Sequence, residues 1–206
     1  KDDDNIYLDA IISSQPKNTK LPRFHYRAKL RLVKQKPERA VYPRVDLTVR
    51  EDIPGQQFYD DYTLFHHYSF KGVKRVLNID KDKVTLLCQL PVVEASYQGQ
   101  FPVQSFNHFM TDIGFQSMGI YAKYHYGAGS LPLKAGGGEH YVDVPWGAEV
   151  YVTLEIHQAS ETGLVTTLYI HDTDGNIYMT VMQGEITISK RLNDLFRRNT
   201  LPERLG

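Results

Sequence analysis

The fold of this chain is decided by one stretch of sequence, Phe106-Asn107-His108-Phe109-Met110-Thr111-Asp112-Ile113-Gly114-Phe115-Gln116. Its apolar residues recur at helical spacing, so we expect one long helix over about 103–124 that is buried on nearly all sides. Asp112 and Gln116 are four residues apart and therefore point the same way from this helix. A carboxyl group on such an apolar helix is costly unless it is paired, neutral or functional.

Strand signals surround the helix. Apolar runs and alternating apolar and polar residues predict strands at 45–49, 73–79, 84–90, 149–158, 164–172 and 177–189. The turn Asp172-Thr173-Asp174-Gly175-Asn176 is a strong hairpin signal between the last two. This order of strands, one long helix and long antiparallel strands favours an α+β fold, the hot-dog fold, in which a curved antiparallel sheet wraps around one long apolar helix.

The first 36 residues read as a separate part of the chain. Residues 23–33 alternate between apolar and mostly basic side chains, which predicts a strand with one buried and one wet face, and 6–12 is a shorter apolar run. The lysine- and proline-rich segment that follows reads as a linker. The expected organisation is an N-terminal part at 1–36, a linker at 37–44, the hot-dog domain at 45–190 and a C-terminal linker or tail at 191–206.

The composition excludes several classes of function. Lys+Arg and Asp+Glu number 24 each, and a balanced charge argues against a general nucleic-acid or anionic-membrane surface. The single cysteine, Cys88, rules out an internal disulfide and a cysteine-rich zinc site. No apolar run approaches the ~18 residues that a membrane-spanning helix needs. Because the first residues resemble neither a signal peptide nor a natural start, we expect a piece of a longer, cytoplasmic polypeptide.

Two further features do not indicate a bound phosphate or metal. The run Gly136-Gly137-Gly138 lacks the Lys-Ser/Thr pair of a phosphate-binding loop, so we expect a connecting loop there. His66 and His67 are adjacent, point apart and have no carboxylate or cysteine cluster beside them, so we predict no metal site.

Three segments, in the right order, resemble motifs of one protein family. The first is Phe65-His66-His67-Tyr68-Ser69-Phe70-Lys71-Gly72-Val73, where the family has Phe-His-Gly-Pro-x-Phe-Gln-Gly-Ile. The second, Asp112 to Gln116, fits the family's DxxxQ motif, and the third, Leu131-Pro132, falls where the family has a Leu-Pro after the helix. Over about 45–190 the chain is similar to the dehydratase domains of polyketide synthases and of polyunsaturated-fatty-acid-type multifunctional synthases.

The chain departs from the family's motifs at a few positions. The family's Gly-Pro is His67-Tyr68 here, and its Gln is Lys71. Leu133-Lys134-Ala135 stands where the family often has an aromatic residue. These departures leave the expected fold unchanged and concern substrate preference and activity.

Dehydratase domains of this family are double hot-dogs with the active site between two units, and the match here is to the second unit. The resemblance implies that 1–36 holds the last strands of the first unit, or an N-terminal extension. It also implies that the catalytic His comes from an HxxxGxxxxP motif in the first unit, and this motif does not occur in the chain. The implied substrate is a 3-hydroxyacyl thioester on the phosphopantetheine of an acyl carrier protein, and the product is the 2,3-enoyl thioester. The domain would bind no metal or cofactor of its own.

The resemblance assigns roles to individual residues. Asp112 would donate a proton to the departing hydroxyl, and Gln116 would orient its carboxyl. To act as an acid, the carboxyl must keep its proton near neutral pH, which burial beside Phe109 and Phe115 favours. The residues implied to bind substrate are His66, Phe70, Leu131 and Pro132.

Each role has a structural alternative that the sequence leaves open. Asp112 could bond a nearby strand, Gln116 could be purely structural, and His66 could be a packed, hydrogen-bonded side chain. The whole unit could be a non-catalytic pseudo-dehydratase, with a structural or carrier-docking role, or a product-template-like domain. The expected partners are an acyl carrier protein and neighbouring synthase domains. Because a lone hot-dog would expose a sheet edge and an apolar wall, we also expect a dimer or a double hot-dog.

Overall fold

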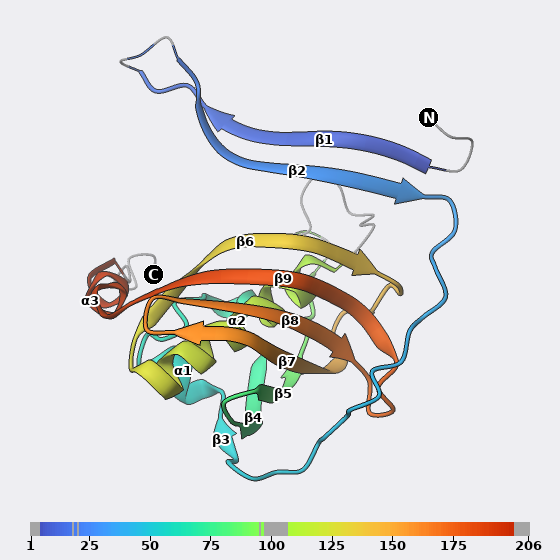
Figure 1. Ribbon diagram of the computed structural model, residues 1–206, viewed down its shortest axis with the longest axis vertical. Helices are drawn as coiled ribbons and strands as arrows, with labels where there is room; N and C mark the ends of the chain where they lie inside the picture. The colour runs from blue at the N-terminus through green and yellow to red at the C-terminus, as the bar shows by residue number, and fades with distance from the viewer. Residues whose placement is uncertain (1–4, 18, 20, 95, 97–106, 200–206) are drawn as a thin grey trace. The chain divides into compact units, whose positions relative to one another are not determined.

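The computed structural model describes residues 5–17, 19, 21–94, 96 and 107–199, in two units that divide between Pro37 and Glu38. The first unit is an antiparallel hairpin of β1 (Asn5–Ser14) and β2 (Arg23–Val33). The second is a seven-stranded antiparallel sheet that curves over the helix α2 (Figure 1). Among the described residues, no helix is long and apolar enough to cross a membrane.

The strands of the second unit lie in the sheet order β3-β4-β5-β7-β8-β9-β6. In chain order they are β3 (Ile53–Pro54), β4 (Val73–Ile79), β5 (Lys83–Gln89), β6 (Gly129–His140), β7 (Glu149–Ser160), β8 (Gly163–His171) and β9 (Ile177–Ser189). The helical elements are α1 (Gln56–Asp60), the 3-10 turn η1 (Tyr68–Phe70), α2 (His108–Tyr126) and α3 (Lys190–Asn199). The strands β4 and β9 have the bounds that the sequence predicts.

The helix α2 forms the centre of the core, which confirms the predicted hot-dog plan. It packs against most strands of the sheet, and its fully buried side chains include Met110, Ile113, Met118 and Ile120. The side chain of Asn107 accepts a hydrogen bond from the backbone N–H of Phe109 (3.2 Å) and caps the start of the helix. Gly127 ends it with a left-handed φ of 62°. The predicted helical residues 103–106 lie outside the described part of the chain.

Two local predictions are wrong. Residues 45–49 form no strand, because the carbonyl oxygens of Asp46 and Thr48 accept hydrogen bonds from the side chain of Asn78 (3.1 and 3.2 Å) instead of a strand backbone. The glycines 136–138 are not a loop but part of β6, where Gly137 and Gly138 pair with β9. β9 pairs with β8 along one edge only, so its other edge offers a backbone partner that outweighs the weak strand preference of glycine.

The hairpin of the first unit does not have the one buried face that its alternating sequence predicts. Cross-strand partners such as Leu8 and Leu30, or Ile12 and Tyr26, place apolar side chains opposite one another on one face. These side chains are nevertheless exposed, Tyr26 by 71%. A two-stranded hairpin has no third layer with which to cover its own apolar face, so this surface stays open within the unit.

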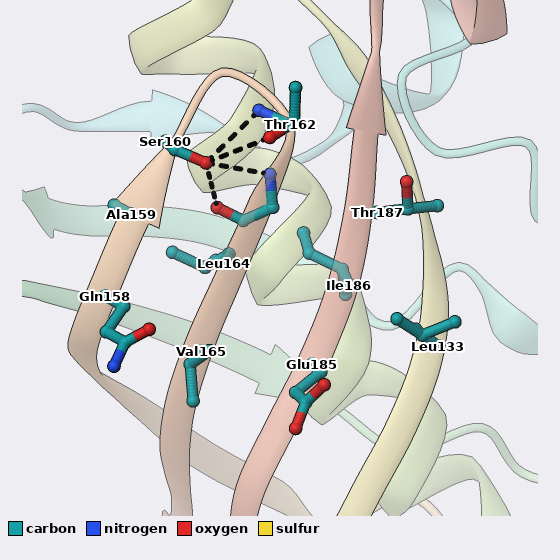
Figure 2. A pocket seen from close by; sticks show the side chains of 11 residues that line it. Leu133, Gln158, Ala159, Ser160, Thr162, Leu164, Val165, Glu185, Ile186 and Thr187 are labelled. Carbon is teal, nitrogen blue, oxygen red and sulfur yellow. Dashed lines mark hydrogen bonds between the residues drawn. The ribbon is translucent and has the colours of Figure 1, made fainter.

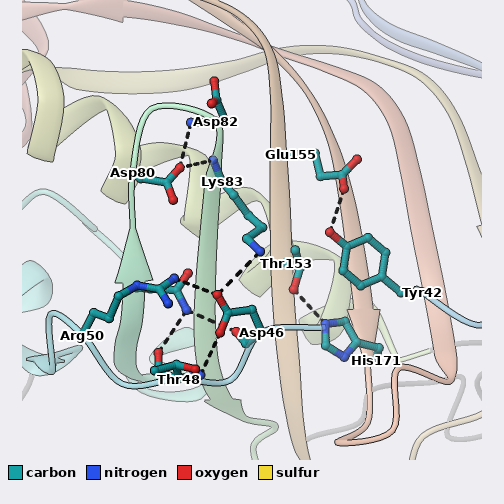
Figure 3. Close-up of polar contacts among 11 residues, drawn as sticks. Tyr42, Asp46, Thr48, Arg50, Asp80, Asp82, Lys83, Thr153, Glu155 and His171 are labelled. Atoms are coloured by element: carbon teal, nitrogen blue, oxygen red, sulfur yellow. Dashed lines mark hydrogen bonds and ion pairs between the residues drawn. The ribbon is translucent and has the colours of Figure 1, made fainter. Parts of the chain in front are cut away.

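Residues 38–44, which were predicted to be a linker, belong to the second unit and pack against its sheet. Arg39 forms an ion pair with Asp172 (2.9 Å), and the buried Tyr42 donates its hydroxyl to Glu155 (2.7 Å). Figure 3 shows this tyrosine beside the imidazole of His171. At the other end of the chain, part of the predicted C-terminal tail forms α3, and residues 200–206 lie outside the described part.

The buried His171 predicts a pH dependence of stability. Thr153 Oγ1 lies 2.8 Å from its Nε2, and burial lowers the pKa of the imidazole below its ordinary value of 6.5. The unfolded chain therefore takes up this proton more readily than the folded one, so stability is complete above about pH 6.5 and falls as the pH drops below it. Urea unfolding of H171Q between pH 8 and pH 5 should show a weaker pH dependence than the wild type. The exposed-histidine variant H157Q serves as control, and an unchanged slope in H171Q would contradict the assignment.

Candidate active site

The helix α2 presents Asp112 and Gln116 on one face, as the sequence predicts. Asp112 Oδ2 accepts a hydrogen bond from Gln116 Nε2 (2.7 Å). Asp112 Oδ1 lies 3.6 Å from Nε2 of His66, in the loop before η1. The side chain of Asp112 is 30% exposed, so it is only partly buried, whereas its apolar neighbours in the sequence predict strong burial. An acid, an amide and an imidazole thus meet within one unit.

The amide of Gln116 is held in one orientation by a buried tyrosine. Tyr59, on α1, accepts a hydrogen bond from the backbone N–H of Val73 (3.0 Å) and donates its own proton to Gln116 Oε1 (2.6 Å). The NH2 group of Gln116 must therefore face the other way, where it donates to the carbonyl oxygen of Phe70 (2.7 Å) and to Asp112. Burial raises the pKa of Tyr59, so its hydroxyl stays protonated and keeps donating.

This hydrogen-bond chain distinguishes the two oxygens of Asp112. Oδ2 is engaged by Gln116, whereas Oδ1 is the oxygen that a second partner can approach. Oδ1 is also the oxygen that faces His66. The sequence did not predict Tyr59, because an aromatic pair in a short polar segment shows no periodicity and indicates only core packing; the polar tip of its side chain was the one available signal.

A pocket of about 350 Å³ opens beside this carboxyl group. Of the predicted residues, it is lined by His66, Phe70, Asp112, Gln116 and Pro132. Leu131 is not among the lining residues, because successive residues of β6 point to opposite faces and Ser130 and Pro132 take the inward positions. The Nδ1 atom of His66 is buried and has no hydrogen-bond partner among the described residues. The pocket thus combines a mostly apolar wall with a few polar groups, as ligand sites commonly do.

A second hollow lies beside the turn between β7 and β8 (Figure 2), where Ser160 Oγ accepts hydrogen bonds from the backbone N–H groups of Thr162 (3.3 Å) and Gly163 (3.2 Å). Among the described residues that line it, Glu185 alone is ionisable, so it holds no acid–base pair. The described residues contain no group of three His, Cys, Asp or Glu side chains that could hold a metal ion.

Comparison with known proteins agrees with this architecture. No protein-family model matches the chain. Over 131 residues, 62% of the chain, it is 26% identical to one of the subunits of the polyunsaturated fatty acid synthase of Thraustochytrium sp., and it spans 5% of that polypeptide.

Solved structures give the fold. A trans-AT polyketide synthase dehydratase domain from Brevibacillus brevis has a TM-score of 0.67 at 12% identity, over 89% of this chain and 65% of that one. The dehydratase domain of the CurF module of curacin polyketide synthase has a TM-score of 0.64 at 16% identity, over 89% and 65%. The dehydratase domain of PpsC from Mycobacterium tuberculosis, in complex with C12:1-CoA, has a TM-score of 0.61 at 16% identity, over 89% and 64%. The predicted resemblance is confirmed at the level of fold: the chain has the hot-dog fold of polyketide synthase dehydratase domains and spans about 65% of their length.

Proposed function

We propose that the chain is the second half of a dehydratase domain in a polyketide or fatty-acid-type multifunctional synthase. It would remove water from a 3-hydroxyacyl thioester on an acyl carrier protein and release the 2,3-enoyl thioester. The observation that carries this proposal is the Asp112 carboxyl, held by Gln116 on the wall of a mostly apolar pocket. The PpsC domain, which shares the fold, was solved with an acyl thioester, and this supports an acyl thioester as the ligand.

The proposed chemistry divides between two groups. A base removes the proton next to the thioester carbonyl, and Asp112 gives the proton on Oδ1 to the departing 3-hydroxyl, so that water leaves and the 2,3 double bond forms. Gln116 holds Oδ2 and fixes the direction of the carboxyl. We assign the base to a His outside this chain, because the chain lacks the HxxxGxxxxP motif and spans about 65% of the dehydratase chains that it matches. His66, beside Oδ1, would bind the substrate oxygen or the carboxyl.

The partners follow from this chemistry. The phosphopantetheine arm of an acyl carrier protein would deliver the substrate, and neighbouring synthase domains would supply the rest of the site. The structural match covers 89% of the chain, more than the second unit alone contributes, so it includes part of the hairpin. This supports the assignment of β1 and β2 to the first hot-dog unit of the same domain.

A non-catalytic hot-dog module is the second candidate. It is favoured by the departures at His67, Tyr68 and Lys71 from the dehydratase motif. In the structure, the rings of His67 and Tyr68 stack edge to face (3.9 Å between centroids), and Lys71 lies over the ring of Tyr59 (5.7 Å). Two aromatic rings thus lie at the start of η1 where the motif has glycine and proline, although neither lines the pocket.

An assay of 3-hydroxyacyl thioesters separates the two candidates. The isolated chain should show no dehydration, because it lacks the base, and the full-length protein should show it. Formation of the enoyl thioester is followed by its ultraviolet absorbance or by mass spectrometry. Turnover by the isolated chain would contradict our assignment of the base. No turnover by the full-length protein, with a folded domain, would favour the non-catalytic module.

A further inference from the structure

Two glycines interrupt the helix α2, and the structure explains one of them by packing. Glycine weakens the interior of a helix relative to alanine, so each glycine there calls for a physical reason. A Cβ atom at Gly114 would lie 3.0 Å from Cδ1 and 3.3 Å from Cδ2 of Leu168 on β8. The close approach of the helix to the sheet therefore favours glycine at position 114.

Neither packing nor backbone geometry accounts for Gly119. A Cβ atom there would meet Leu64 Cδ2 at 3.4 Å and Ser130 Oγ at 3.5 Å, which are ordinary contact distances. The residue lies within the regular helix, where alanine is favoured. Gly119, Leu64 and Ser130 all line the pocket of Asp112, so a side chain at position 119 would take up space in that pocket.

The position of Gly119 along the pocket, relative to Asp112, indicates what could fill this space. Asp112 and Gly119 are seven residues apart on one face of α2, about 10 Å along the helix axis. Asp112 is the partly exposed end of this row, and Gly119 is buried. Between them lie Phe115 and Gln116, and Ile186 of β9 also lines the pocket.

We infer that the glycine at position 119 keeps the buried end of the pocket open for an acyl chain, so that residue 119 determines how long a chain the pocket admits. The inference rests on the proposed function, because it takes the ligand to be an acyl thioester. The thioester and the 3-hydroxyl would then lie near Asp112, and the far end of the acyl chain would reach the backbone at position 119. A short chain would not extend so far along the helix face.

Binding of two pantetheine analogues tests this inference on the full 206-residue chain. Stable amide analogues carry a butanoyl or a dodecanoyl group and are titrated by calorimetry into the wild type, G119A and G119L. We expect G119L to weaken dodecanoyl binding by about tenfold or more and to change butanoyl binding by less than about twofold, with G119A between G119L and wild type for dodecanoyl. The control G137A adds a methyl group on β6 outside the pocket and should change neither affinity.

Thermal unfolding supplies a second readout that needs no ligand. G119A should raise the melting temperature by about 2–4 °C, since alanine favours the helix and meets no clash, whereas G114A should lower it. A lower melting temperature for G119A would overturn the inference, because packing would then require the glycine. Equal effects of G119L on both chain lengths, or none, would also overturn it. If the wild type binds neither analogue, the result contradicts the acyl ligand of the proposed function, and the role of residue 119 is contradicted as well.

Discussion

Replacing Asp112 with asparagine should abolish dehydration by the full-length protein while leaving the domain folded. A positioned acid or base contributes roughly 100- to 10,000-fold to a rate, and an amide cannot supply the acidic proton. The substitution keeps the shape of the side chain, so its oxygen can still accept the hydrogen bond from Gln116 Nε2. The loss should therefore appear in kcat, measured as formation of the enoyl thioester, with little change in KM.

A matched variant controls for the loss of one negative charge near the pocket. Asp61 forms an ion pair with Lys123 on α2 (3.2 Å) and does not line the pocket. D61N should retain nearly all of the dehydratase activity, while D112N loses it. An acid should contribute roughly 100-fold or more to the rate. If D112N keeps activity within about threefold of the wild type, Asp112 is not the acid.

Replacing Tyr59 with phenylalanine should destabilise the domain and lower the rate of dehydration together. The change leaves two buried groups without a partner, the backbone N–H of Val73 and Oε1 of Gln116. Each unsatisfied buried group costs about 1–3 kcal/mol, so we expect a loss of about 2–6 kcal/mol in the free energy of unfolding by urea. Gln116 also loses the contact that fixes its amide, and the carboxyl of Asp112 loses a positioned donor.

The variant Y121F separates the effect on Gln116 from a general loss of stability. Tyr121 is also buried, but its hydroxyl donates to the carbonyl oxygen of Lys81 (3.1 Å), outside the pocket. Y121F should lower stability and leave kcat unchanged. In a double-mutant cycle on kcat, Y59F should have little further effect once Gln116 is alanine. Additive effects of Y59F and Q116A would show that Tyr59 acts independently of Gln116.

The sequence predicted the elements whose periodicity is long and undisturbed. Apolar residues at helical spacing predicted α2, and the row of Asp112 and Gln116 followed directly from the geometry of a helix. The run 45–49 alternates apolar and polar residues, which is typical of a strand, but the side chain of Asn78 bonds the carbonyl groups of Asp46 and Thr48. A local pattern cannot reveal a hydrogen-bond partner that lies some thirty residues away.

The site was only partly predictable for the same reason. The motif resemblance indicated Asp112, Gln116 and His66, and the structure brings these three together. Tyr59 joins them from α1 only because β4 and α1 fold against the helix. No residue spacing in the sequence predicts this packing. The glycines of β6 are a second example of a distant partner that decides local structure. Glycine disfavours strands, but pairing with β9 keeps these residues in a strand.

The hydrogen bonds from β4 to the carboxyl group have a practical consequence for observing the site. The backbone amide of Val73 is joined to Asp112 through Tyr59 and Gln116 by three successive hydrogen bonds. Any event that moves the carboxyl or rotates the amide of Gln116 must reorganise the partner of that one backbone proton. The exchange rate and chemical shift of a single NMR signal, the amide of Val73, should therefore report on the Asp112 carboxyl without a probe attached to the pocket.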